Sequence, residues 1–425
     1  MTRGGGEASS WDGRPAGRGR DGARLTTSSP VAALRRAASY PITRVYSAPA
    51  SRADGGRDLS ALPKAHLHLH FTGSMSPDTL SRVATSNGDL LDMLLDSSQI
   101  EFDAATPRGW GRFQRRYDLA RRAVRSEQAL RMIVTQAARD DATEGSRRME
   151  IQVDPTSYAP FVDGLANALD IILDAARSAS AETGVQVGVI VAASRVRHPL
   201  EARTLARLAG RHAGQRPGSV VGFGLNSDEN AGDTAAFAPA FRIAERAGLP
   251  AMPHGGELRG PEHVRQVVEQ LHPTRIGHGV RAVEDPRLLA DMVDAGIAFE
   301  VCPTSNVHLG VYDRVADVPL RALVDAGARV VLGADDPLLF GSRLTDQYRL
   351  AREVFGFSDP DLADLARASL LASTALDADK VRWLAEVDAW LASPPGWHPH
   401  AAGATSLPTR GTLLAGGWRD GRPVD

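Results

Sequence analysis

Three histidines at alternate positions in one short segment form a pattern typical of metal binding. The segment from Lys64 to Phe71 reads KAHLHLHF, so His66, His68 and His70 alternate with apolar residues. Alternate side chains of a β-strand point to the same face, where several imidazoles could bind one ion such as zinc. Because barrel enzymes act at the carboxyl ends of their strands, we expect His68 and His70, rather than His66, to be ligands.

Further acidic and imidazole groups follow three later apolar runs. His254 ends one run with Glu257 three residues beyond it, and His278 ends another between two glycines. Asp335 and Asp336 close a third run. Burial of two adjacent carboxylates in an apolar core costs free energy, so this pair favours a functional role for both residues. For Asp336, capping of a following helix remains an alternative.

Eight short apolar runs divide the chain and are candidate strands, with helical patterns between most of them, for example at 165–178 and 320–326. Alternation of strands and helices favours a parallel sheet, and eight units favour closure into a (β/α)8 barrel of the TIM type. An open doubly wound sheet is the alternative, but no G-x-G-x-x-G turn follows the first run. The predicted strands span 65–71, 149–153, 185–192, 220–225, 249–254, 275–278, 297–302 and 329–332.

Composition divides the chain into three parts. Residues 1–57 are rich in Gly, Arg, Ser and Ala, and we expect a disordered leader there. Residues 58–393 form the predicted barrel domain, in which the long interval 72–148 should supply extra helices that cap the barrel mouth. Residues 394–425 are rich in Pro and Gly, which indicates a loosely ordered tail.

Charge and cysteine usage exclude several classes of protein. The formal net charge is -2, so no overall basic field favours nucleic acid. The single cysteine, Cys302, excludes an internal disulfide framework and fits a reducing compartment. No apolar run approaches the roughly 18–20 residues of a membrane span, and no signal-peptide core is evident. We therefore expect a cytoplasmic protein that has no membrane partner.

Five motifs in order resemble those of the adenosine deaminase family, which belongs to the metal-dependent amidohydrolases. They are P-K-A-x-L-H-x-H, H-G-G-E, G-H-G, C-P-T-S-N and D-D-P, and they lie between about Leu62 and Leu371. The resemblance implies a small-molecule purine substrate and one zinc ion per chain. The implied ligands are His68, His70, His254 and Asp335.

The resemblance also implies catalytic roles. Glu257 would donate a proton to purine N1, His278 would position the attacking water, and Asp335 would act beside the metal. Such a metal lowers the pKa of bound water to about 7, and attack at C6 places negative charge on the ring that a carboxylic acid can neutralise. Other amidohydrolase barrels hold two metals through a lysine that follows the fourth strand. That position has no lysine here, which favours one metal.

Four residues are expected to contact the substrate: His70, Thr72, Ser227 and Asp336, the last through purine N7. The family usually has Glu at position 66, Asp at position 72 and Gly at position 227. The Asp at 72 meets the ribose 5′-hydroxyl in the family, so its replacement by threonine leaves the substrate open. Adenosine and 2′-deoxyadenosine, converted to inosine-type products and ammonia, are the first candidates. Aminodeoxyfutalosine and adenine are the alternatives.

Two alternative functions belong to other classes of protein. The first is a catalytically silent, deaminase-like binding protein, which would have little use for a complete set of catalytic residues. The second is a nucleic-acid deaminase, whose zinc site needs H-x-E with P-C-x-x-C and so cannot form with one cysteine. Cys302 is expected to pack at a strand end, and Asn306 to fix the shape of its loop. No sequence feature indicates a particular oligomeric state.

Overall fold

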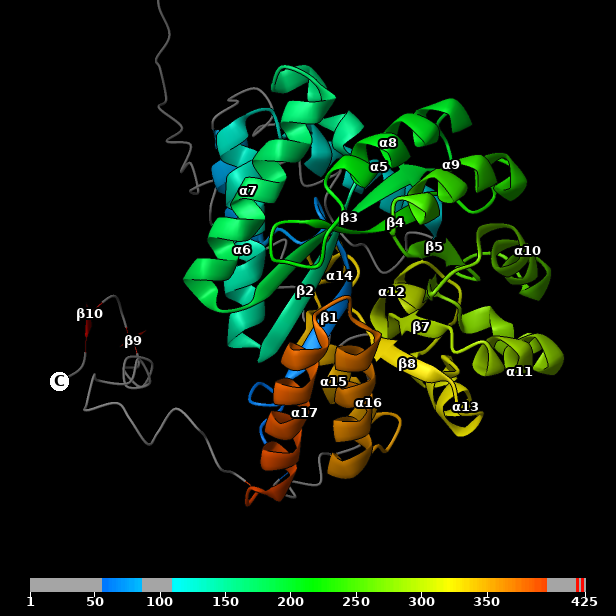
Figure 1. The fold of residues 1–425 in the computed structure, drawn as a ribbon. Coiled ribbons are helices and arrows are strands. Elements are labelled where there is room, and N and C mark those ends of the chain that lie inside the picture. Colours follow the sequence, from blue (N-terminus) through cyan, green and yellow to red (C-terminus); the bar gives the residue numbers. More distant parts are fainter. Residues whose placement is uncertain (1–55, 86–108, 396–417, 420–421, 424–425) are drawn as a thin grey trace, which may run out of the picture.

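Eight parallel strands in sequential order form a nearly closed barrel, which confirms the predicted TIM-type fold (Figure 1). The computed structural model describes residues 56–85, 109–395, 418–419 and 422–423. The strands are β1 (Lys64–His70), β2 (Ser146–Val153), β3 (Gln186–Ser194), β4 (Val220–Asn226), β5 (Ala251–Gly255), β6 (Arg275–His278), β7 (Ala298–Val301) and β8 (Arg329–Leu332).

Burial on both faces explains why these strands read as continuous apolar runs. Both predicted ends are confirmed for β6 and β8, and the other six strands differ from prediction by one to three residues at an end. The seam between the last and first strands closes just beyond β8. There Asp335 N donates to His68 O at 3.1 Å, and His70 N donates to Asp335 O at 3.0 Å.

Helices surround the barrel and connect successive strands (Figure 1). The predicted helix at 165–178 begins at the expected residue and runs five residues further, and the predicted helix at 320–326 ends one residue earlier. The connecting helices include α7 (Leu165–Thr183), α8 (Pro199–Arg211), α9 (Thr234–Arg246), α10 (Pro261–Leu271), α11 (Pro286–Asp294), α12 (Pro303–His308) and α13 (Leu320–Asp325). After β8 follow α14 (Pro337–Phe340), α15 (Leu344–Glu353), α16 (Asp359–Ala372) and α17 (Asp377–Ala392).

The long interval after β1 contains extra helices, as predicted. These are α2 (Pro77–Thr85), α5 (Trp110–Arg122) and α6 (Glu127–Thr143). Helix α5 packs on α14, where the rings of Phe113 and Phe340 stack with centroids 5.4 Å apart. This contact holds α5 beside the end of β8, where the candidate catalytic residues lie. No helix among the described residues is long and apolar enough to cross a membrane.

Arg57 joins the segment before β1 to the last helices. It donates to Asp359 at the start of α16 and to the carbonyl of Ser393 after α17. The predicted disorder of the leader falls, for residues 1–55, outside the described residues. In the tail, β9 (Trp418–Arg419) and β10 (Arg422–Pro423) form a short antiparallel pair.

Lys64, the first residue of β1, joins three segments at the base of the barrel. Its side chain is fully buried, and its Nζ donates to the carbonyls of Leu59 at 2.8 Å, Leu62 at 3.0 Å and Glu144. Burial lowers the pKa of Lys64 to about 8. A buried ammonium group is tolerated here because all three of its protons have acceptors.

Replacement of Lys64 by methionine should therefore destabilise the fold. Lys64→Met leaves three buried carbonyls without their donor, and we expect the free energy of unfolding to fall by about 3 kcal/mol. Urea denaturation monitored by circular dichroism measures this change. The control is Lys380→Met, which alters the only other lysine, at a surface site. Equal stability of the two variants would contradict the assigned role of Lys64.

Candidate active site

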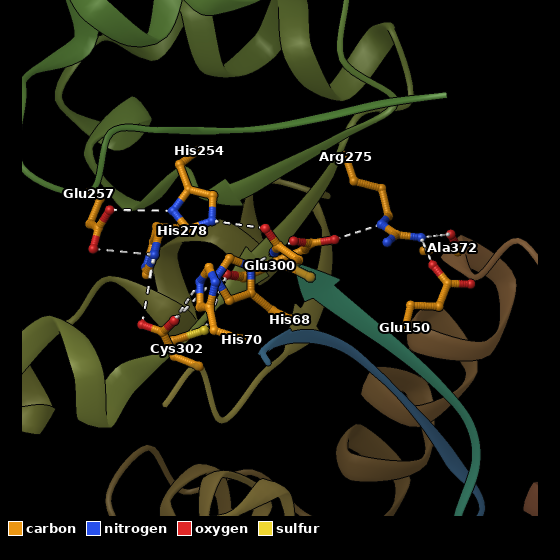
Figure 2. Close-up of polar contacts among 12 residues, drawn as sticks. His68, His70, Glu150, His254, Glu257, Arg275, His278, Glu300, Cys302 and Ala372 are labelled. Atoms are coloured by element: carbon orange, nitrogen blue, oxygen red, sulfur yellow. Dashed lines mark hydrogen bonds and ion pairs between the residues drawn. The ribbon is translucent and has the colours of Figure 1, made fainter. Parts of the chain in front are cut away.

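Four imidazoles from three strands converge at the carboxyl end of the barrel (Figure 2). His68 and His70 come from β1, His254 from β5 and His278 from β6. The ring centroid of His68 lies 5.3 Å from that of His70, 4.7 Å from that of His254 and 4.9 Å from that of His278. All four side chains are buried. The structure thus brings together the histidines that the sequence singled out, with the exception of His66.

Asp335 completes this cluster from the turn after β8. Its Oδ1 lies 3.1 Å from His70 Nε2 and 3.4 Å from His68 Nε2. Burial opposes its charge, but the contacts with the two histidines hold the pKa of Asp335 well below its usual range. Asp335 adopts a positive φ of 62°, in the left-handed region that is unfavourable for residues other than glycine.

The donor set fits a divalent metal ion. His68 Nε2 and His278 Nε2 are buried and have no hydrogen-bond partner among the described residues. Ligand atoms of His68, His254 and His278 lie within 4.8 Å of one another, and so do those of Glu257, His278 and Asp335. Burial, followed by its imidazole neighbours, lowers the pKa of His254 well below its usual value, so this ring is neutral as a metal ligand must be.

A chain of buried ion pairs extends from His68 into the barrel (Figure 2). Glu300 Oε2 lies 2.7 Å from His68 Nδ1, and Arg275 Nε donates to Glu300 Oε1 at 2.6 Å. Arg275 also donates to Glu150 at 2.7 Å, and Glu150 accepts from Arg148 at 3.0 Å. The carboxylate of Glu300 holds a proton on His68 Nδ1, which leaves the Nε2 lone pair directed at the cluster.

Sequence reasoning missed this chain of ion pairs. A signal was present, because charged residues that interrupt short apolar strands need partners of opposite charge inside the barrel. Pairing between these residues could not be read from the sequence, since they come from strands β2, β6 and β7.

Glycines make room for the imidazoles. A Cβ atom on Gly277 would lie 2.8 Å from the rings of both His68 and His254, and one on Gly333 would lie 2.6 Å from His68 Cβ. These distances are shorter than real Cβ contacts, so even alanine would displace the rings. The glycine before His278 is therefore required for close packing of the cluster.

Glu257 lies in the loop after β5 and faces the imidazoles. Its Oε2 is 3.4 Å from His254 Nδ1, and its Oε1 is 3.6 Å from His278 Nε2. Burial first, and then the nearby Glu229 and Asp335 carboxylates, raise the pKa of Glu257 well above its usual value. A carboxyl group in these surroundings is protonated and can act as an acid.

Glu229, a second residue that the sequence did not reveal, shapes the loop of Glu257. Its buried carboxylate accepts the backbone N–H groups of Glu257 at 3.1 Å, Leu258 at 2.7 Å and Arg259 at 2.8 Å. Arg195 donates to the carbonyl of His254 at 2.7 Å from the same side. Together these bonds fix the position at which β5 ends and Glu257 begins.

His278 is held as a neutral imidazole with a positive φ of 62°. Burial lowers its pKa to about 3. Asn306 lies in the short helix α12 rather than in the loop that the sequence had predicted, and its side-chain nitrogen is 3.5 Å from His278 Nδ1, so it orients this ring. Asp336, the next candidate, has an Oδ1 that is buried without a hydrogen-bond partner among the described residues.

Asp336 does not cap helix α14, because its side chain makes no capping hydrogen bond. Burial and the charge of Asp335 raise the pKa of Asp336 well above its usual range. Its carboxyl group lies directly over Gly73, where an added Cβ would be only 1.7 Å from Asp336 Oδ1. The structure therefore assigns Asp336 to the wall of the site rather than to helix capping.

A cavity opens beside the cluster. Of the expected substrate-binding residues, His70, Ser227 and Asp336 line it. Ser227 has a φ of 75°, which explains why glycine suits this position in the resembling family. Thr72 does not belong to the lining; its hydroxyl is fully buried and lies 2.6 Å from Tyr158 Oη.

His66 and Cys302, which the sequence also singled out, do not line the cavity. His66 Nδ1 is 3.0 Å from Asp141, and its Nε2 accepts from Ala334 N at 3.2 Å, so both ring nitrogens are engaged away from the cluster. Cys302 is buried beside the cluster, with Sγ 3.6 Å from the carbonyl of Glu300 and within 4.8 Å of ligand atoms of His68 and Asp335. Burial raises the pKa of this thiol well above its usual value.

Fold and site together define a hydrolase of the amidohydrolase barrel type that carries out deamination. The model of the adenosine deaminase family matches residues 63–390, and the chain belongs to this family. The match spans β1 to α17 and so includes every residue of the cluster.

Named relatives differ in their substrates. A Streptomyces virginiae protein, provisionally named adenosine/adenine deaminase, is 54% identical over 79% of this chain and 98% of its own length. The aminodeoxyfutalosine deaminase of Streptomyces avermitilis is 33% identical over 80% of this chain and 96% of its own. The crystal structure of an Arthrobacter aurescens adenine deaminase superposes with a TM-score of 0.71 at 29% identity, over 78% of this chain and all of that one.

The contact between His68 and Glu300 predicts how tightly a metal is held. Glu300→Gln retains the shape of the side chain but removes its charge, and we expect roughly 10- to 100-fold weaker binding of Zn²⁺ in a chelator competition assay. The exposed residue Glu353, changed to glutamine, serves as the control. Unchanged Zn²⁺ affinity in Glu300→Gln would mean that the carboxylate does not act on the metal ligand.

Proposed function

We propose that this protein deaminates a 6-aminopurine by zinc-dependent hydrolysis, with adenosine and 2′-deoxyadenosine as the first candidate substrates. The observation that carries this proposal is the convergence of Glu257, His278 and Asp335, whose ligand atoms lie within 4.8 Å of one another beside the cavity. An acid, a neutral imidazole and a carboxylate at one point are the groups that addition of water to an amidine carbon requires.

One zinc ion would be held by His68, His70, His254 and Asp335. Three imidazoles and a carboxylate are a donor set that zinc favours. When bound, zinc supplies a water of lowered pKa. The neutral ring of His278 would orient the attacking water toward C6, and the carboxylate of Asp335 would be the acceptor for the proton of that water.

Protonation of the ring falls to Glu257. Its raised pKa keeps the carboxyl group protonated, so it can donate to N1 as negative charge develops there. Protonated Asp336 donates to N7, and the backbone N–H of Ser227 lies at the cavity wall as a donor for N3. The C6–N bond would then break as the amino group takes up the proton accepted by Asp335 and leaves as ammonia, while the C6 hydroxyl returns a proton to Glu257 and becomes a carbonyl. This arrangement would be unnecessary in a protein that only binds its ligand.

Adenine is a second candidate that one observation favours. Thr72 stands where the family has an aspartate for the ribose, and its hydroxyl is bonded to Tyr158 rather than exposed to the cavity. The carboxylate that contacts the ribose in the family is therefore missing at this position. The similar proteins include an adenine deaminase and an aminodeoxyfutalosine deaminase, so both compounds remain candidate substrates of this protein.

Ammonia release from a panel of substrates tests the proposed function. Adenosine, 2′-deoxyadenosine, adenine and aminodeoxyfutalosine should include at least one efficient substrate, and purified protein should contain close to one zinc per chain. Zinc-loaded protein that deaminates none of them would identify a silent binding protein. Two metals per chain, both needed for turnover, would contradict the one-metal site.

The role of Glu257 predicts a loss of rate without loss of metal. Glu257→Gln cannot give a proton to N1, and we expect kcat to fall by roughly 10²- to 10⁴-fold while zinc content stays at the wild-type level. Steady-state kinetics and elemental analysis of the same preparation measure both effects. Loss of zinc from this variant would instead identify Glu257 as a ligand.

The two adjacent aspartates should respond differently to the same substitution. Asp335→Asn should lower zinc content and kcat together, because Asp335 contacts two ligand histidines. Asp336→Asn should keep zinc and mainly raise KM, because its carboxyl group faces the cavity. Each variant is the control for the other. Equal loss of metal in both would disprove the division of roles.

A further inference from the structure

Asp154 contributes a carboxylate to the cavity wall that the proposed function leaves without a role. It follows Val153, the last residue of β2, so it lies at the carboxyl end of the barrel where active-site groups gather. Among the described residues that line the cavity, the other carboxylates are Glu257 and Asp336. Both of these are assigned to the purine ring, whereas Asp154 is not.

The two oxygens of Asp154 differ in their contacts. Oδ1 accepts from Thr156 N at 3.0 Å and from Thr156 Oγ1 at 2.6 Å, which caps the short turn after β2. Oδ2 forms an ion pair with Arg197 Nε at 3.7 Å, a distance too long for a hydrogen bond. The side chain is only 13% exposed, so Oδ2 has unused acceptor capacity at the edge of the cavity.

Ser157, three residues further along, gives a second and independent indication. Its hydroxyl is buried without a hydrogen-bond partner among the described residues, and Ser157 lines the same cavity. Buried polar groups normally have partners, because a missing one costs free energy. An acceptor and a hydroxyl that both lack hydrogen-bond partners on one wall point to a polar ligand at that place.

The neighbouring wall explains why Asp154 is available for this task. Tyr158 Oη lies 2.6 Å from Thr72 Oγ1, so Thr72 is engaged with protein. Tyr158 lines the cavity and belongs to the same connection as Asp154. The acidic group at this end of the cavity thus comes from the end of β2 rather than from the loop after β1.

We propose that Asp154 determines specificity by accepting a hydrogen bond from a neutral donor on the side of the purine remote from its 6-amino group. This inference rests on the proposed function. A sugar hydroxyl of a nucleoside and the N9–H of free adenine are donors of the same chemistry. A carboxylate cannot donate to a phosphate and repels its charge, so Asp154 itself is unsuited to binding one.

Substitutions at Asp154 can test whether its carboxylate accepts a hydrogen bond from one of these donors. In Asp154→Asn the remaining oxygen can still cap Thr156, while the other oxygen becomes an N–H donor. Asp154→Ala removes the acceptor without adding a donor. The matched control is Asp163→Asn, an exposed residue of the connection between β2 and α7 that lies outside the cavity wall. Zinc content and circular dichroism should match the wild type in all three variants.

The measurement is kcat/KM for adenosine, its 2′-, 3′- and 5′-deoxy analogues, adenine and 9-methyladenine. Wild type should reject one analogue that lacks the donor by roughly 10- to 150-fold, the range for a hydrogen bond to a charged group. Rejection of one deoxy analogue identifies a sugar hydroxyl, and rejection of 9-methyladenine identifies N9–H. Asp154→Asn and Asp154→Ala should reduce this discrimination to about threefold or less, and Asp163→Asn should retain it.

Several results would overturn the inference while deamination itself stands. One is wild-type discrimination that persists in both Asp154 variants. Others are an equal loss of kcat/KM on every substrate, or wild type that rejects none of the analogues. Failure of both variants to fold would assign Asp154 to its turn alone and would also overturn it. Wild-type protein that deaminates no aminopurine would instead contradict the proposed function.

Discussion

The structure depends on the placement of His68 between two buried carboxylates. Asp335 faces its Nε2 and Glu300 its Nδ1, and all three side chains are almost completely buried. Burial alone would lower the pKa of His68, but its contacts with Asp335 and Glu300 raise it to about 10. The two carboxylates favour positive charge at Nε2, which either a divalent cation or, without that cation, a proton can supply. The barrel interior is therefore preorganised for positive charge at this point.

Such a concentration of charge needs compensation within the barrel. Arg275 lies between Glu300 and Glu150, and Arg148 pairs with Glu150, so two guanidinium groups offset two carboxylates. Removal of one partner from such a chain leaves an uncompensated buried charge, which is strongly destabilising. Thr374, between α16 and α17, donates to Glu150 at the far end. The chain of buried ion pairs thus links His68, at the carboxyl end of the barrel, to the packing of Thr374 at the opposite end.

Much of this architecture could be predicted, because parallel strands buried on both faces leave continuous apolar runs and the motifs lie where those runs end. His68, His70, His254, His278 and Asp335 all carried that signal. Glu229 and Arg195 did not, since their roles depend on contacts between loops or strands far apart in sequence. Thr72 shows another limit of prediction from sequence. The direction of its hydroxyl depends on Tyr158, which lies 86 residues away.

The seam of the barrel has a consequence for how the protein is made. Asp335 closes the last strand onto the first through its own backbone, and the same residue contacts the two histidines of β1. A nascent chain that ends before residue 335 has neither a closed barrel nor the complete set of proposed ligands, even though His68 precedes Asp335 by some 270 residues. The proposed metal centre would consequently be completed late in synthesis.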